Sequence, residues 1–126
     1  MKKMYLTLPL FALIVACGGG NEKKDDAGTE TAVVDLSSNP DYQKGLELVG
    51  KSDCLTCHKV SDKNIGPAYK DVAAKYENTD ENVKMLAGKI IKGGQGVWGA
   101  IPMTPHTSLS EADAEQMVKY ILLLKK

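Results

Sequence analysis

The feature that most constrains this chain is the run Cys54-Leu55-Thr56-Cys57-His58. Two thiols and an imidazole stand so close together in a sequence chiefly where they bind a metal, exchange electrons or carry a covalently attached group. A bound group would also add to the hydrophobic core. The chain has only 126 residues and 6% aromatic side chains, so its own core is expected to be small. The run thus predicts a small domain that is completed by a bound cofactor.

The spacing Cys-x-x-Cys-His is the attachment motif of c-type haem. Two cysteines at this spacing lie on one turn, so Cys54 and Cys57 can form thioethers to the former vinyl groups of one porphyrin. The next residue, His58, then projects toward the iron and can be its proximal ligand. The motif therefore predicts one covalently attached haem.

Other chemistries fit the same residues less well. A redox-active dithiol of the thioredoxin kind would follow a strand in an alternating strand–helix pattern, and no such pattern is visible. A tetrahedral zinc site would have to use Cys54, Cys57, His58 and His106, and the adjacent pair Cys57 and His58 rarely converges on one metal. A structural disulfide between the two cysteines is less favoured still.

The N-terminal residues 1–16 are predicted to be a signal peptide. Lys2 and Lys3 precede an apolar run that ends at Ala16, and this run is too short to span a membrane. Its end resembles the lipobox of bacterial lipoproteins, which implies cleavage before Cys17 and lipidation of that cysteine. An ordinary secretory signal followed by a free cysteine is the alternative. The resemblance implies an extracytoplasmic protein held to a membrane by a lipid anchor.

Residues 17–39 are predicted to be the lipidated cysteine followed by a flexible tether. The segment opens with Gly18-Gly19-Gly20 and continues with polar and charged residues, which bury too little apolar surface to favour an ordered structure. A flexible coil of this length spans roughly 25 Å. The remaining residues, 40–126, are predicted to form the haem domain.

Residues 40–126 predict an all-α domain with about four short helices, because apolar residues recur at helical spacing. Asn39-Pro40 and Ser110 mark helix starts, and Gly93-Gly94 marks a helix end. Gly45 is expected to be a point of close packing with Tyr120 as a neighbour. The apolar stripes are Tyr42, Leu46 and Val49; Tyr69, Val72, Ala73 and Tyr76; Val83, Leu86, Ala87, Ile90 and Ile91; and Ala114, Met117, Val118, Ile121 and Leu124.

The domain resembles the small bacterial monohaem class I cytochromes c. The resemblance lies in three motifs in family order, namely residues 54–58, the run Ile65-Gly66-Pro67-Ala68-Tyr69, and the run from Gly93 to Met103 with sequence GGQGVWGAIPM. It implies the class I cytochrome c fold, with short helices wrapped around one covalently attached haem c and its iron.

The second axial ligand has three methionine candidates. Met85 and Met117 lie on predicted helices and are expected to fill the core. Met103 lies in a loop between Pro102 and Pro105, which stiffen it, and the resemblance also places the methionine ligand there. Met103 is therefore the predicted ligand. His106, in the same loop, is the rival.

The resemblance also implies roles for residues around the iron. The carbonyl of Pro67 is expected to accept a hydrogen bond from the ring of His58, although Gly66-Pro67 could simply be a turn. Trp98 is expected to donate its indole N–H to a haem propionate, or else only to pack on the haem. Tyr69 and Ile101 are expected to line the haem, and either could be ordinary core.

A haem with both axial positions filled by His58 and Met103 predicts a one-electron carrier rather than an enzyme. A haem enzyme or ligand sensor with a labile Met103 is the alternative. The expected partners are the donor and acceptor redox proteins of a respiratory chain, and we expect a monomer. Equal numbers of basic and acidic residues, 16 each, argue against nucleic-acid binding. Some lysines lie near the haem motifs and either steer an acidic partner or are simply solvated: Lys59, Lys63, Lys70 and Lys92.

Overall fold

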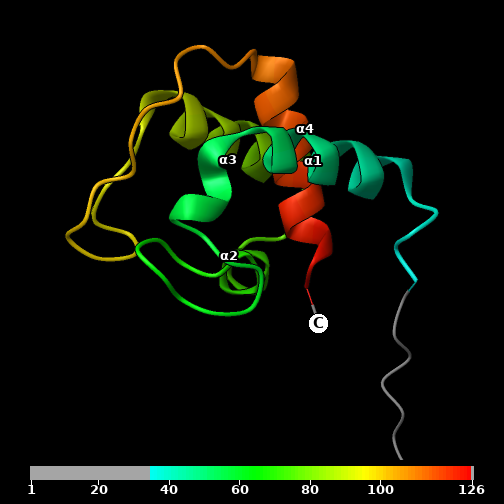
Figure 1. The fold of residues 1–126 in the computed structure, drawn as a ribbon, viewed down its shortest axis with the longest axis horizontal. Coiled ribbons are helices and arrows are strands. Elements are labelled where there is room, and N and C mark those ends of the chain that lie inside the picture. Colours follow the sequence, from blue (N-terminus) through cyan, green and yellow to red (C-terminus); the bar gives the residue numbers. More distant parts are fainter. Residues whose placement is uncertain (1–34, 126) are drawn as a thin grey trace, which may run out of the picture. The chain divides into compact units, whose positions relative to one another are not determined.

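The computed structural model describes residues 35–125 (Figure 1). These residues form an all-α fold without β-strands, which confirms the predicted fold class. None of their helices is both long enough and apolar enough to cross a membrane. The predicted signal peptide, Cys17 and most of the predicted tether lie outside the described residues. The elements are α1 (Pro40–Lys51), the 3-10 turn η1 (Asp53–Thr56), α2 (Tyr69–Lys75), α3 (Asp80–Lys92) and α4 (Glu111–Leu123).

The helices begin and end where the local sequence predicts. Oδ1 of Asn39 accepts hydrogen bonds from the backbone N–H groups of Asp41, at 2.9 Å, and Tyr42, at 3.1 Å, so it caps α1. Oγ of Ser110 accepts from the backbone N–H of Asp113 at 3.1 Å and caps α4. Gly93 ends α3 with a φ of 79°, a conformation that favours glycine.

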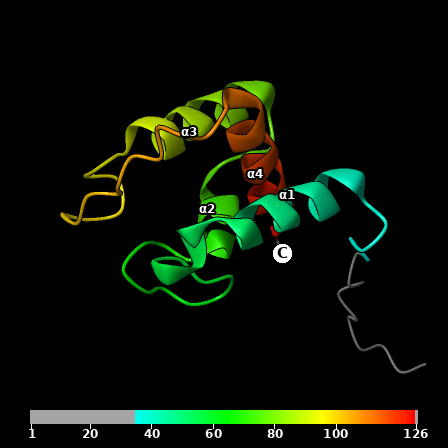
Figure 2. The ribbon, with the colours of Figure 1, turned by 45° about the horizontal axis from the view of Figure 1, so that its top comes forward.

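The packing of α1 across α4 organises the domain (Figures 1 and 2). A Cβ on Gly45 would lie 2.3 Å from Cβ of Tyr120 and 2.5 Å from the carbonyl oxygen of Gln116, so only glycine permits this approach. The side-chain amide of Gln116 donates to both the carbonyl oxygen and Oδ1 of Asp41, each at 3.1 Å. The predicted close contact between the first and last helices is confirmed.

The core is built on α4, which packs against α1, α2 and α3. The apolar stripes predicted for α2, α3 and α4 point largely inward, but the stripe predicted for α1 is wrong at Leu46, which is 42% exposed. The face of α1 that meets α4 is centred on Gly45 and Val49, and Leu48 packs there instead of Leu46. The buried apolar core comprises Val49, Ala68, Tyr69, Ala73, Val83, Ala87, Ala114, Met117, Val118, Tyr120, Ile121 and Leu122.

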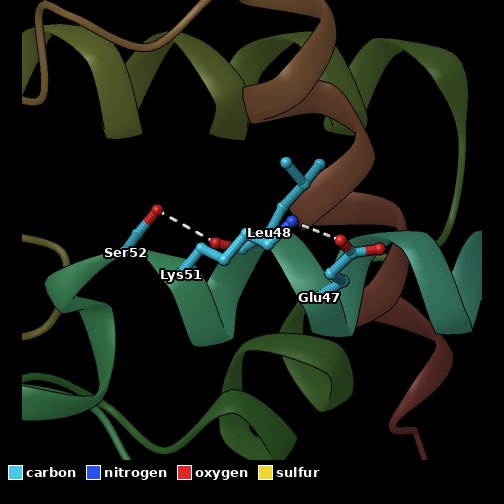
Figure 3. Close-up of polar contacts among 4 residues, drawn as sticks. All are labelled: Glu47, Leu48, Lys51 and Ser52. Carbon is cyan, nitrogen blue, oxygen red and sulfur yellow. Dashed lines mark hydrogen bonds and ion pairs between the residues drawn. The ribbon is translucent and has the colours of Figure 1, made fainter.

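The end of α1 leads directly into η1, and polar contacts fix this junction (Figure 3). Oγ of Ser52 donates to the carbonyl oxygen of Leu48 at 2.9 Å, and the Lys51 ammonium pairs with the Glu47 carboxylate one helical turn earlier. Ser52 itself adopts an extended backbone conformation, which stops the helix. The chain therefore turns at Ser52, and the next residues carry the Cys-x-x-Cys-His run.

Candidate functional site

Cys54 and Cys57 lie on one tight turn. Cys54 is within η1, and the backbone N–H groups of Cys57, at 3.2 Å, and His58, at 3.0 Å, both donate to the carbonyl oxygen of Cys54. Both thiols are free and partly exposed. The turn therefore presents two unpaired thiols and an imidazole from one short run of the chain, residues 54–58, as the motif predicts.

The imidazole of His58 is held in one orientation by its neighbours. Its Nδ1 lies 2.8 Å from the carbonyl oxygen of Pro67, which only accepts hydrogen bonds, so Nδ1 carries the proton and Nε2 keeps its lone pair. The ring stacks on Tyr69, with centroids 5.4 Å apart and planes at 19°. A Cβ on Gly66 would lie 2.4 Å from Cε1 of His58. Nε2 is therefore the nitrogen available to a metal.

The segment between His58 and α2 is fastened by backbone hydrogen bonds. The N–H of Gly66 donates to the carbonyl oxygen of Cys57 at 2.8 Å, and the N–H of Tyr69 donates to that of Lys59 at 2.9 Å. The side-chain amide of Asn64 donates to the carbonyl oxygen of Thr56 at 3.1 Å. These bonds bring Gly66 and Pro67 back against His58, although they lie further along the chain.

Met103 lies at the end of a loop that returns to α3. The N–H of Met103 donates to the carbonyl oxygen of Gly94 at 2.8 Å, which forms an isolated antiparallel bridge and closes the base of the loop. Within the loop, the N–H of Gly96 donates to the carbonyl oxygen of Gly99 at 3.0 Å, and both glycines have positive φ. The position of Met103 is thus set by the end of α3 rather than by a helix of its own.

All the predicted site residues line one cavity of about 610 Å³, namely Cys54, Cys57, His58, Pro67, Trp98 and Met103. A cavity of this size suits a small molecule or cofactor. The thiols and the imidazole come from η1 and the residues that follow it, whereas Trp98 and Met103 come from the loop after α3. The fold therefore brings two separate segments of the chain to one site.

The walls of the cavity are mostly apolar. Buried core residues of α1, α2 and α4 line it, including Val49, Tyr69 and Met117. Large apolar side chains that are at least 38% exposed also line it, namely Ile65, Met85, Val97, Trp98 and Ile101. An apolar cavity that offers two thiols, one oriented imidazole and one thioether fits an iron porphyrin.

The arrangement does not fit the zinc alternative. Among residues 35–125, no three or more His, Cys, Asp or Glu side chains are grouped so that they could hold a metal ion. In particular, Nε2 of His106 donates to Oδ1 of Asp53 at 3.1 Å and is directed to that carboxylate.

Comparison with known proteins decides the family, because the model of the family described as "Cytochrome c" matches residues 42–125. The chain belongs to the cytochrome c family. Accordingly, it is a haem-based electron carrier with one covalently attached c-type haem and its iron. The match covers every residue that lines the cavity.

Individual relatives agree with this assignment. Cytochrome c-552 of Nitrosomonas europaea is 48% identical over 83 residues, which cover 66% of this chain and 81% of that protein. Cytochrome c-552 of Hydrogenobacter thermophilus is 46% identical over 79 residues, which cover 63% of this chain and 80% of that protein. The crystal structure of Nitrosomonas europaea cytochrome c552 is 49% identical and has a TM-score of 0.60, over 64% of this chain and 99% of that one.

Two expectations about the methionines of this cytochrome c differ in outcome. Met117 is 1% exposed and belongs to the core, as predicted. The prediction for Met85 is wrong, because its side chain is 38% exposed and lies at the cavity rather than in the core. The sequence places Met85 on a helix correctly, but the face of α3 on which it lies lines the cavity.

Burial raises the pKa values of two groups that line the cavity, Cys54 and Tyr69. Desolvation raises the pKa of the Cys54 thiol above its ordinary value, and the neighbouring Asp53 carboxylate adds to this rise. Desolvation also raises the pKa of the Tyr69 hydroxyl, to which the nearby Cys54 contributes. Both groups therefore stay protonated at neutral pH.

Asp53 is the site residue that sequence reasoning missed. Its carboxylate accepts from Nε2 of His106, a residue that lies far along the chain in the Met103 loop. Nothing local in the sequence marks this contact, since Asp53 reads as an ordinary acidic residue in the first turn of η1.

Proposed function

We propose that this cytochrome c is a membrane-tethered one-electron carrier on the extracytoplasmic side, passing electrons between redox proteins of a respiratory chain. The observation that carries the proposal is that His58 and Met103, from separate segments, line the same apolar cavity as Cys54 and Cys57. This set supplies two attachment points and two axial ligands for one haem. The function follows from filling both axial positions with protein side chains.

Each residue has a role in holding the haem. The thiols of Cys54 and Cys57 would hold the haem through thioether links to its former vinyl groups, and Nε2 of His58 and the thioether of Met103 would ligate its iron. The carbonyl of Pro67 keeps the His58 ring in the tautomer and orientation that ligation needs. When bound, such a haem gains and loses one electron at its iron, and a thioether ligand raises its potential.

Polar groups at the cavity suit the propionates of the haem. Trp98 carries an indole N–H, and Lys63 and Lys89 also line the cavity. The ammonium of Lys75 lies 5.6 Å from the centre of the Trp98 ring, where a cation–π contact helps to position the indole. We assign Trp98 as a hydrogen-bond donor to a haem propionate. The ammonium groups of Lys63 and Lys89 would attract the negative charge of the propionates.

Two features favour electron transfer over catalysis. With both axial positions filled by His58 and Met103, no coordination site would be open to oxygen or peroxide, so we propose an electron carrier rather than an enzyme. Apolar side chains line the cavity, among them Ile65, Val97 and Ile101, and the parts of them that the haem leaves uncovered would offer a surface on which a redox partner docks close to the haem. We propose that the protein docks there as a monomer.

The location is proposed from the N-terminal sequence. Cleavage before Cys17 and lipidation of that residue would anchor the chain, because each buried CH₂ of an acyl chain contributes about 0.8 kcal/mol. The residues between Cys17 and α1 would then act as a tether that raises the local concentration of the domain near membrane-bound partners.

Replacement of the axial ligand tests this function. Met103→Ala is expected to abolish the charge-transfer band of the thioether–iron(III) bond while the haem stays covalently attached, and His106→Ala is expected to keep the band. The reduced wild-type protein should resist carbon monoxide near neutral pH. Loss of the band in His106→Ala alone would contradict the ligand assignment, and ready binding of carbon monoxide would favour a ligand sensor or haem enzyme.

A further inference from the structure

His106 links two segments that meet only at the haem cavity. Its Nε2 donates to Oδ1 of Asp53 at 3.1 Å, and both residues line the cavity. Asp53 immediately precedes the attachment cysteine Cys54, and His106 follows Met103 in the same loop. Among the hydrogen bonds of residues 35–125, this is the one that joins the Met103 loop to the turn that carries the cysteines.

The imidazole of His106 is firmly placed in its own loop. The backbone N–H of His106 donates to the carbonyl oxygen of Ile90 in α3 at 3.1 Å, and its carbonyl accepts from the N–H of Leu109 at 3.1 Å. Its side chain is only 20% exposed, and Nδ1 is buried with no hydrogen-bond partner among the described residues. Burial of Nδ1 without a hydrogen-bond partner is unfavourable. The hydrogen bond from Nε2 to Asp53 offsets part of that cost and holds the imidazole in place.

The remaining bonds of the loop do not reach the cysteine turn. The Met103 N–H and the His106 N–H both bond to residues at the end of α3, Gly94 and Ile90. Those bonds fix the base of the loop relative to α3. They do not fix the distance between Met103 and the turn that carries His58. The His106–Asp53 hydrogen bond connects these two segments.

We propose that His106 is a positioning residue for Met103, whose bond to Asp53 fastens the Met103 loop to the haem-attachment turn and opposes displacement of the thioether from the iron. This inference rests on the proposed function, in which Met103 is the distal ligand. The effect is modest, because the Asp53 side chain is 77% exposed and water weakens its interaction with His106.

Competition with an added ligand tests the proposal on the oxidised holoprotein. Imidazole is titrated into the wild type, His106→Ala, Asp53→Ala and the double variant, while the thioether–iron(III) charge-transfer band is followed. Each single variant is expected to bind imidazole about 2- to 5-fold more tightly than the wild type, as loss of one weak hydrogen bond to an exposed carboxylate predicts. The double variant is expected to match the single ones, because both remove the same bond.

Two further variants separate positioning from general stability. Glu47→Ala removes the exposed pair with Lys51 beside the same turn, but it touches no part of the Met103 loop, so imidazole binding should stay as in the wild type. His106→Gln retains a side-chain donor for Asp53 and should recover most of the wild-type resistance to imidazole.

The outcomes are distinguishable. The proposal is overturned if His106→Ala and Asp53→Ala bind imidazole as the wild type does, or if their effects add in the double variant. It is also overturned if His106→Ala loses the band before any imidazole is added, since His106 would then itself be a ligand. If the wild type lacks the band, the assignment of Met103 fails, and with it the function from which this inference starts.

Discussion

Nδ1–H of His58 donates to the carbonyl oxygen of Pro67 at 2.8 Å, and this single bond decides which ring nitrogen faces the haem cavity. A hydrogen bond to the second nitrogen of a ligating histidine also increases electron donation to the metal. The neighbouring residue makes the geometry possible, because Gly66 lies against the ring where any side chain would collide.

Gly66→Ala tests this arrangement. The added Cβ would lie 2.4 Å from Cε1 of His58, so the ring or the loop must shift and the bond to Pro67 must lengthen. We expect a loss of about 1–3 kcal/mol in the free energy of unfolding and a higher reduction potential, measured by denaturation and by redox titration. Gly88→Ala is the control, because a Cβ there meets nothing within 4 Å. An unchanged potential in Gly66→Ala would contradict this account of His58.

Gly45→Ala tests the crossing of α1 and α4. A Cβ at residue 45 would lie 2.3 Å from Cβ of Tyr120, so the helices must separate, and we expect a loss of about 1–3 kcal/mol in the free energy of unfolding. Gly50 lies in the same helix, and a Cβ there would meet nothing within 4 Å. Gly50→Ala should therefore stabilise the protein by about 0.5–1 kcal/mol. Chemical denaturation of both variants measures these changes. Equal changes in the free energy of unfolding for Gly45→Ala and Gly50→Ala would contradict close packing of α1 against α4 at Gly45.

The helices of this domain could be predicted because their signals are local. The cap at Asn39, the glycine at residue 93 and the apolar stripe of α4 each depend on residues within a few positions. The Cys-x-x-Cys-His turn could likewise be predicted, since attachment chemistry determines its spacing. The resemblance to a family supplied Pro67 and Trp98, whereas both the loop position and the resemblance favoured Met103. The structure places all three at the cavity.

What the sequence did not reveal depends on contacts between distant segments. Leu46 and Met85 are apolar residues on helices, yet Leu46 is 42% exposed and Met85 lies at the cavity rather than in the buried core. The bond between His106 and Asp53 requires the Met103 loop to return to the cysteine turn, and no periodic pattern encodes that return.

The raised pKa of Tyr69 predicts an alkaline loss of stability. Burial keeps the hydroxyl protonated in the folded protein, whereas in the unfolded chain it ionises near pH 10. Above about pH 10 the unfolded state therefore binds fewer protons, and the free energy of unfolding falls as the pH rises. Tyr69→Phe should weaken this fall, although Tyr120, whose pKa burial also raises, leaves part of it. Denaturant unfolding at several alkaline pH values is the measurement, and identical slopes for variant and wild type would refute the prediction.

Cys17→Ser tests the lipid anchor. A serine offers no thiol for acylation, so the exported protein should move from the membrane fraction to the soluble fraction. The absorption spectrum of the haem domain should not change, which serves as the control for correct folding. Fractionation of cells with and without detergent measures the distribution. Continued association of the variant with membranes would contradict the lipoprotein assignment.

The covalent haem is the central claim, and the purified exported protein tests it most directly. The protein is expressed in a host with haem-attachment machinery, and its alkaline pyridine spectrum and its thiol content are measured. We expect one haem per chain with the spectrum of a haem that has lost both vinyl groups, and no reaction of Cys54 or Cys57 with a thiol reagent under denaturing conditions. A colourless protein in which both thiols react would contradict the account.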